Sequence, residues 1–374
     1  MIDPQFKIKI TSFYEDVKKL KQKLTSKYKI SLFLIKNLNL VDKLSSNSSK
    51  ENKYFIYNWK ILEKFQEDTE NLVRIELRVF SKRSGKNFNL KFLIYEKMNE
   101  FLITISNLNY LNQKKIRRFI NSYYPFVFNF YLIHDEIFGV IEELESKFLY
   151  PFISRWYIIS EKFGKKADKD IRYRRGIYYK KCFIKAREDD KFVEQIRLDN
   201  INSFSKFNNG VPYDFKITRK GQISIYRGSF DKFFLFLIER IIFVANGKYL
   251  LLKDRSREIT VNNEINPVII EFFSSPFKEK EGIDALLKIL KEYTNCSYAI
   301  IHAGNPYLEM IFVDYADNSS FSLVTFSNKS LIIYPQLYAS GSALLKLFDY
   351  ITERYSDGIL YDYEDYKKNI LYDL

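Results

Sequence analysis

Histidine and cysteine are both scarce in this chain. Its only histidines are His134 and His302, and its only cysteines are Cys182 and Cys296. Two histidines so far apart exclude a locally encoded histidine metal site or histidine-based triad, and no cysteine pair has metal-ligand spacing. We interpret His302 as structural and expect no metal and no cofactor. Because so few cysteines argue against a disulfide-stapled secreted protein, we expect a reducing cytoplasmic location.

Long hydrophobic runs are also missing. The most apolar window is FFLFLIERIIFVA, residues 233–245, and Glu239 with Arg240 interrupts it. That is well short of the roughly 20 residues that cross a bilayer, so the window predicts a buried helix without membrane insertion. The amino-terminal MIDPQFKIKI has no basic region followed by an apolar run, and we expect no targeting signal.

Glycine-rich phosphate loops are absent as well. Neither a Walker motif nor a dinucleotide-binding glycine fingerprint occurs in the sequence. SKRSGKN contains Gly85 and Lys86, but it lacks the first Walker glycine and the Ser or Thr that follows the lysine. We interpret this segment as a turn.

Positive charge and aromatic side chains are abundant. The formal net charge is +14, and 17% of the residues are aromatic. An AT-rich coding sequence would also enrich lysine, but it would spread the charge evenly. Instead, residues 162–187 hold eleven basic side chains against Asp168 and Asp170. This concentration favours a polyanionic partner.

Three segments of the middle third form the predicted nucleic-acid site. The first is the window at 162–187, where RYRR and IYYKK interleave cations with tyrosine; the second is the ITRKGQISIYRG hairpin; the third is LLKDRSRE, whose cations alternate as on one face of a strand. We expect one of Tyr178 and Tyr179 to lie in the core. The candidate phosphate-binding residues are Lys165, Lys166, Arg172, Arg174, Arg175, Tyr178, Lys180, Arg219, Lys220, Arg227, Lys253, Arg255 and Arg257.

The pattern of strands and helices predicts an α+β fold of mainly antiparallel sheets with packed helices in two to three subdomains. We expect an amino-terminal α+β domain at 1–150, a basic middle domain at 151–262, and a carboxyl-terminal α+β domain with an acidic tail at 263–374. A hairpin should turn at Lys220 and Gly221.

Helices are expected at residues 11–24, 112–124, 135–148, 281–293 and 342–355. In the middle domain, IYYKKCFIKAR and KFVEQIRLDNI read as paired strands. Ser229 should cap the apolar helix, Gly247 should end it, and Gly358 should end the last of the helices.

Two other functions compete with nucleic-acid binding. A metal-dependent nuclease could use Glu309, Asp314 and Asp317 near the carboxyl end, or Glu76 on an early strand, although Glu309 and Asp314 should point to opposite strand faces. A membrane-surface or protein-interaction module is the third class. We favour a non-enzymatic binding subunit, because the carboxylates converge on no catalytic signature.

The segment DFKITRKGQISIYRGSFDKFF, a hairpin followed by a helix in a basic α+β chain, resembles the APAZ-like partner proteins of short prokaryotic Argonautes. The resemblance implies a heterodimer with a short Argonaute and binding of a guide RNA and target DNA duplex in antiviral defence. It also implies signalling to a separate effector, since no fused effector domain is apparent. The resemblance supplies no catalytic motif.

Overall fold

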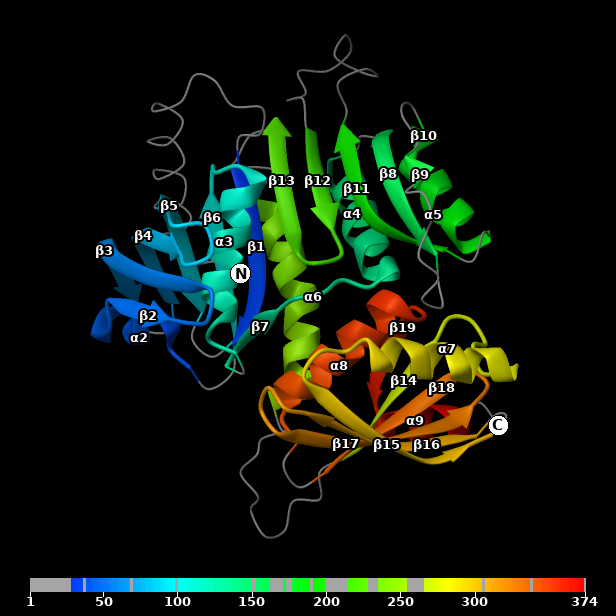
Figure 1. The fold of residues 1–374 in the computed structure, drawn as a ribbon. Coiled ribbons are helices and arrows are strands. Elements are labelled where there is room, and N and C mark those ends of the chain that lie inside the picture. Colours follow the sequence, from blue (N-terminus) through cyan, green and yellow to red (C-terminus); the bar gives the residue numbers. More distant parts are fainter. Residues whose placement is uncertain are drawn as a thin grey trace, which may run out of the picture.

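Two antiparallel sheets with packed helices make up the fold of the computed structural model, as the sequence predicts (Figure 1). The structure describes residues 28–35, 38–67, 70–97, 100–124, 126–148, 153–161, 171–172, 177–188, 191–199, 214–227, 235–253, 266–304, 307–336 and 339–372, some of them by their backbone alone. The predicted helix at 11–24 and the capping residue Ser229 lie outside these residues.

The first sheet has 13 strands in the order β10-β8-β11-β12-β13-β1-β6-β5-β4-β3-β2, with β7 paired to β1 and β9 paired to β8. Its strands are β1 (Tyr28–Ile35), β2 (Ser49–Glu51), β3 (Phe55–Glu67), β4 (Glu70–Ser81), β5 (Lys86–Lys97), β6 (Phe101–Ser106), β7 (Val127–Asn129), β8 (Ile153–Glu161), β9 (Ile171–Arg172), β10 (Ile177–Tyr178), β11 (Lys191–Asp199), β12 (Asp214–Thr218) and β13 (Gln222–Arg227).

The second sheet has six strands in the order β15-β16-β17-β18-β14-β19. They are β14 (Val268–Phe272), β15 (Cys296–Ala303), β16 (Leu308–Asp314), β17 (Ser319–Ser327), β18 (Ser330–Pro335) and β19 (Gly358–Asp362). The first sheet draws strands from both sides of residue 150, because β1 pairs with β13. The predicted domain boundaries themselves stay predictions.

The described helices are α2 (Leu40–Ser46), α3 (Tyr110–Asn121), α4 (His134–Phe148), α5 (Tyr179–Glu188), α6 (Leu235–Lys253), α7 (Lys280–Lys291), α8 (Gly341–Arg354) and α9 (Tyr363–Tyr372). Helices α3, α4, α7 and α8 confirm four of the predicted helices. None of the helices in the described part of the chain is long and apolar enough to cross a membrane.

Helix α3 forms where an apolar stripe follows a capping residue. The Asn109 side chain accepts a hydrogen bond from the Asn112 N–H at 3.0 Å, and Ile116, Phe119 and Ile120 are fully buried. These side chains pack with α2 on one face of the amino-terminal half of the first sheet. A second apolar cluster covers the other face and continues into the second sheet, with α4, α6 and α8 contributing to it.

The predicted hairpin is confirmed. Strands β12 and β13 pair in antiparallel register, with Thr218 opposite Gln222, and Gly221 has a φ of +60° in the turn. The Gly221 Cα also lies against Phe130, because an added Cβ would be 2.9 Å from that ring. The hairpin therefore turns at Lys220 and Gly221 and packs onto the segment after β7.

The strand predicted over IYYKKCFIKAR is wrong. Only Ile177 and Tyr178 form a strand, and α5 begins at Tyr179. The reason is the spacing of Tyr179, Cys182, Phe183 and Ala186, which places all four buried side chains on one helix face. The neighbouring KFVEQIRLDNI is indeed a strand, β11, but it pairs with β8 and β12.

Three smaller predictions in the middle and last thirds also need correction. Helix α6 passes through Gly247 and ends at Lys253, so Lys253 belongs to a helix and not to a strand. Gly247 lies inside this helix, and an added Cβ there would meet nothing within 4 Å. Gly358 begins β19 and does not end α8; its Cα lies so close to the Glu271 carbonyl that an added Cβ would be 2.5 Å from that oxygen.

Candidate nucleic-acid interface

Three of the thirteen predicted phosphate-binding side chains are described by the structure, those of Lys180, Arg219 and Lys220. The others lie outside the described side chains and stay predictions: Lys165, Lys166, Arg172, Arg174, Arg175, Tyr178, Arg227, Lys253, Arg255 and Arg257. Tyr179, the neighbour of Tyr178, is fully buried, which confirms that one tyrosine of this pair lies in the core.

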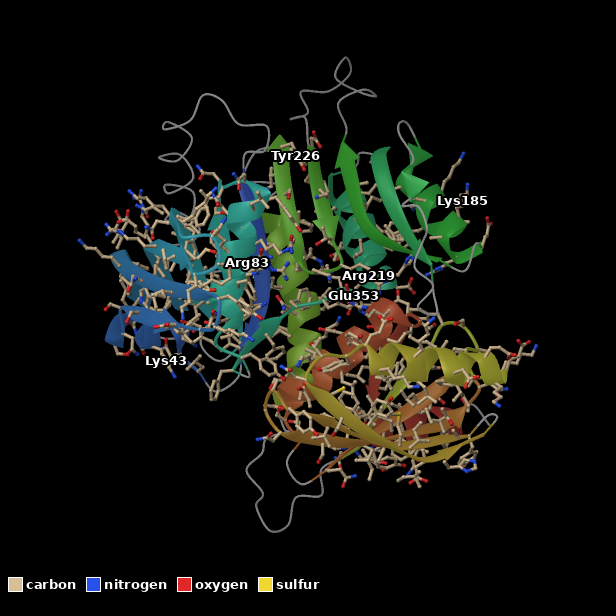
Figure 2. The ribbon with its side chains drawn as sticks, in the orientation of Figure 1. Lys43, Arg83, Lys185, Arg219, Tyr226 and Glu353 are labelled. Atoms are coloured by element: carbon tan, nitrogen blue, oxygen red, sulfur yellow. The ribbon has the colours of Figure 1, made fainter. Side chains whose placement is uncertain are left out.

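Arg219 cannot contact a phosphate in this structure, so its assignment to the interface is wrong. Its side chain is 0% exposed and donates from Nη2 to the Asp357 Oδ1 at 2.7 Å. The guanidinium also lies 4.8 Å from the Tyr131 ring centroid. Figure 2 shows Arg219 between the two sheets, where a buried ion pair joins the β12–β13 turn to the segment after α8.

Lys180 and Lys220 are accessible but already ion-paired. Lys180 Nζ lies 3.1 Å from Glu142 and 3.9 Å from Glu145, both on α4. Lys220 Nζ lies 2.6 Å from Glu353 on α8. Lys180 pairs with α4, Arg219 is buried against Asp357, and Lys220 pairs with α8, so these three side chains do not form one surface.

A different basic surface surrounds α3. Four cations and no carboxylate occur along this helix, at Lys114, Lys115, Arg117 and Arg118. We define the α3 surface as the cations around this helix and the aromatic residues beside them, including the buried Tyr123: Lys50, Tyr54, Phe55, Arg83, Phe88, Lys114, Lys115, Arg118 and Tyr123. Figure 2 shows Arg83, from the β4–β5 turn, beside α3.

Three of the five cations of the α3 surface lie over aromatic rings. Lys50 Nζ is 3.8 Å from the Tyr123 ring centroid, Lys115 Nζ is 3.7 Å from that of Phe88, and the Arg118 guanidinium carbon is 5.5 Å from that of Phe55. Partial burial lowers the pKa of Lys50 and Lys115, and the neighbouring charges of Lys43 and Arg118 lower them further. Such crowding of like charges would be relieved by a bound polyanion.

A pocket of about 780 Å³ opens at the carboxyl end of α3, and we call it the α3 groove. Arg83 and Arg118 line it together with Tyr54, Phe55 and Asn52, and none of its lining residues is acidic. Arginine forks and aromatic faces are the groups that hold phosphates and stack on bases. The groove therefore has the chemistry of a site for single-stranded nucleic acid.

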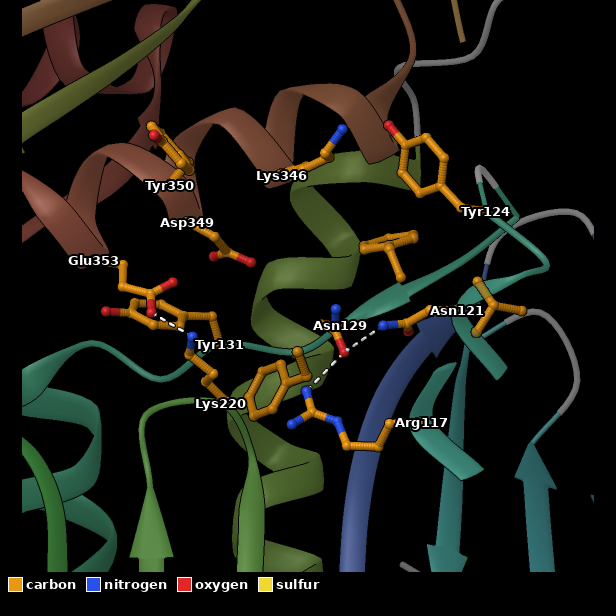
Figure 3. A pocket seen from close by; sticks show the side chains of 13 residues that line it. Arg117, Asn121, Tyr124, Asn129, Tyr131, Lys220, Lys346, Asp349, Tyr350 and Glu353 are labelled. Atoms are coloured by element: carbon orange, nitrogen blue, oxygen red, sulfur yellow. Dashed lines mark hydrogen bonds and ion pairs between the residues drawn. The ribbon is translucent and has the colours of Figure 1, made fainter. Parts of the chain in front are cut away.

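A second pocket, of about 340 Å³, lies between α3, β7, the β12–β13 turn and α8, and we call it the inter-sheet pocket (Figure 3). Asn121 lines both this pocket and the α3 groove. Lys346, Asp349, Tyr350 and Glu353 reach it from α8, since their spacing of three or four residues places them on one helix face.

Hydrogen bonds fix the polar wall of the inter-sheet pocket. Asn129 Oδ1 accepts from Arg117 Nη2 at 2.7 Å and from Asn121 Nδ2 at 3.2 Å. Burial lowers the pKa of Arg117 to about 10 and raises that of Asp349 well above its ordinary value. At neutral pH the Arg117 side chain is therefore charged, and burial favours the neutral form of the Asp349 carboxyl.

Three of the four carboxylates considered for a nuclease have structural partners. Asp314 is fully buried and accepts hydrogen bonds from the Tyr293 hydroxyl at 2.8 Å and from Lys346 at 2.7 Å. Asp317 accepts the Ser319 N–H, and Glu76 accepts from Asn89 at 2.8 Å. In β16, Asp314 is buried and Glu309 half-buried on opposite faces, as their spacing predicts. Within the described ranges, no cluster of three or more His, Cys, Asp or Glu side chains could hold a metal ion.

The sequence contained the signal for the α3 surface. NQKKIRRFINSYY places four cations on a predicted helix without a single acid, and only the partners supplied by β2, β3 and the β4–β5 turn were unknown. A comparison of the chain with models of known protein families gives no match, and neither does a comparison with curated proteins.

Proposed function

We propose that this protein is a non-enzymatic nucleic-acid-binding subunit that holds a phosphate backbone along the α3 surface. The observation that carries the proposal is the α3 groove, where Arg83 and Arg118 stand beside Tyr54 and Phe55 without a lining carboxylate. Because arginine and aromatic side chains recognise phosphates and base faces without reading an edge pattern, binding should be largely independent of sequence.

The wider assignment rests on the resemblance to APAZ-like proteins. Under it, the chain pairs with a short Argonaute, contacts a guide and target duplex, and acts in antiviral defence through a separate effector. The middle-third segment with Arg172, Arg174 and Arg175 would extend the same interface.

The first test removes three exposed cations of the α3 surface. In the variant R83A/K114A/R118A, affinity at low salt should fall for a labelled single-stranded RNA, for a single-stranded DNA and for an RNA–DNA hybrid duplex. If each cation contacts one phosphate, the slope of log affinity against log salt should become shallower by roughly 2 to 3. Fluorescence anisotropy at several salt concentrations measures both quantities.

A matched control removes the same charge elsewhere. Lys280, Lys288 and Lys291 are exposed on α7, which covers the second sheet. K280A/K288A/K291A should leave the affinity and the salt slope close to those of wild type. Equal losses of affinity in both variants would show that binding depends on net charge alone and not on the α3 surface. Unchanged binding in R83A/K114A/R118A would contradict the proposal. R172A/R174A/R175A tests the middle-third segment in parallel.

A further inference from the structure

Arg117 is a largely buried cation without a carboxylate partner. It lies on the inner side of α3, and its Nη2 bonds only the neutral Asn129 amide oxygen, at 2.7 Å. Among the described residues, no carboxylate forms an ion pair with it, and its buried Nε has no hydrogen-bond acceptor. Since burying an arginine without a counter-ion is costly, an anion entering the inter-sheet pocket would stabilise this side chain.

The carboxyl groups of the pocket compensate Arg117 only in part, because Glu353, whose charge raises the pKa of Arg117, also pairs with a lysine. Lys220 is matched by Glu353 at 2.6 Å, and Lys346 is matched by Asp314 at 2.7 Å. Asp349 opposes an anion only when it is ionised, and burial favours its neutral form. Three cations, those of Arg117, Lys220 and Lys346, and two carboxyl groups line the pocket, so its lining favours an anion.

The rest of the lining suits a planar polar ring. Tyr124, Tyr131 and Tyr350 line the pocket from three segments, and Figure 3 shows the rings of Tyr124 and Tyr131 on two sides of the space below α8. Two buried oxygens, Asn121 Oδ1 and Asp349 Oδ1, have no hydrogen-bond partner among the described residues. Leaving such groups without a partner is unfavourable, so they favour a ligand that can donate and accept hydrogen bonds.

We propose that the inter-sheet pocket binds a single nucleotide, with its phosphate at Arg117 and its base among the tyrosine rings. The volume of about 340 Å³ falls within the range of small-molecule sites, roughly 300 to 1,000 Å³. Because Asn121 lines both spaces, the pocket adjoins the α3 groove. The inference rests on the proposed function, since the nucleotide is either free or the end of a strand held on the α3 surface.

The test measures binding of nucleoside 5′- and 3′-monophosphates to the full chain by isothermal titration calorimetry, with the unphosphorylated nucleosides and inorganic phosphate as comparison. At least one monophosphate should bind tenfold or more tightly than both its nucleoside and phosphate alone. If no monophosphate binds, or if inorganic phosphate binds as well as the nucleotides, the inference is overturned. Oligonucleotide binding by the α3 surface would be unaffected by either result.

Two variants locate the site. R117Q removes the buried cation. K220A, at an exposed position, removes a cation at the pocket mouth and leaves the Glu353 carboxyl group without its lysine partner. Each should weaken monophosphate binding by at least tenfold, whereas R83A/K114A/R118A should not. If R117Q fails to fold, the effect of K220A on monophosphate binding alone decides whether the pocket is the nucleotide site. Monophosphate binding that K220A leaves unchanged would place the nucleotide elsewhere and contradict the inference.

A competition experiment separates the two sources of the nucleotide. A linear oligonucleotide and its circular form, which has no ends, should bind the α3 surface alike. If the linear form displaces a bound monophosphate and the circular form does not, the pocket takes the end of a strand. If neither form displaces the monophosphate, the pocket takes a free nucleotide. Displacement by the circular oligonucleotide would show that the monophosphate binds where the strand backbone binds, on the α3 surface, and would overturn the inference.

Discussion

Glu96 illustrates at the scale of one residue how burial sets charge. Its side chain is fully buried on β5 and accepts the Leu40 and Val41 N–H groups at 2.7 and 2.9 Å, at the start of α2. These donors favour the carboxylate, but burial raises the pKa of Glu96 to about 7. In an unfolded chain its pKa would be near 4.3.

Glu96 should make the protein less stable as pH rises. Between about pH 4.3 and 7 the folded state binds the Glu96 proton and the unfolded state does not, so the stabilisation present below this window is lost through it. The loss is on the order of 3 kcal/mol. E96Q stays neutral, so its stability should change less between pH 4.5 and pH 8 than that of the wild type. It should be the less stable protein near pH 4.5, because the Gln amide nitrogen cannot accept one of the two N–H bonds. Parallel pH profiles for the two proteins would contradict this assignment.

At the scale of the element, two helical glycines have opposite surroundings. In α7, a Cβ added to Gly282 would lie 1.6 Å from the Pro276 carbonyl oxygen, so this helix packs directly against backbone. In α4, a Cβ added to Gly139 would meet nothing within 4 Å. Only the first glycine is required by packing.

Substituting alanine at each position should therefore change stability in opposite directions. G139A should raise the free energy of unfolding by roughly 0.5 to 1 kcal/mol, because alanine favours the helix. G282A should lower it by about 1 to 3 kcal/mol, as overpacking does. Urea unfolding of both variants measures the difference, and a stabilised G282A would show that α7 does not pack as described.

At the scale of the whole molecule, the two sheets are joined by a shared apolar cluster and by a buried ion pair. Arg219, from the first sheet, and Asp357, between α8 and β19, are 0% and 2% exposed. Asp357 Oδ2 also accepts the His134 N–H at 2.8 Å, so one carboxylate joins three segments.

Breaking this pair should destabilise the fold strongly. R219A leaves Asp357 buried without its counter-ion and should lower the free energy of unfolding by roughly 3 to 5 kcal/mol. K220A, at the next residue, breaks a solvent-exposed pair and should cost less than about 1 kcal/mol. R219M/D357L should recover much of the loss, because it removes both charges together. Equal effects of R219A and K220A on urea unfolding would argue against the pair as a joint between the sheets.

The sequence by itself determined the features that depend on neighbours in the chain. The α+β class, the hairpin at Lys220 and Gly221, and helices α3, α4, α7 and α8 all follow from local periodicity and turn chemistry. Local patterns predicted the wrong element where the sequence fits both the strand period and the helix period. The segment from Tyr179 to Glu188 is such a case, since it was predicted as a strand and forms a helix.

Only the tertiary structure decided which charges meet solvent and which lie together. Arg219 and Lys220 are adjacent, yet one is buried against Asp357 and the other is exposed. The α3 groove joins Arg83 to Arg118, and the inter-sheet pocket joins Arg117 to Lys346. These pairings depend on packing between segments far apart in the chain, and the free energy of exposing or burying a charge is set by that packing.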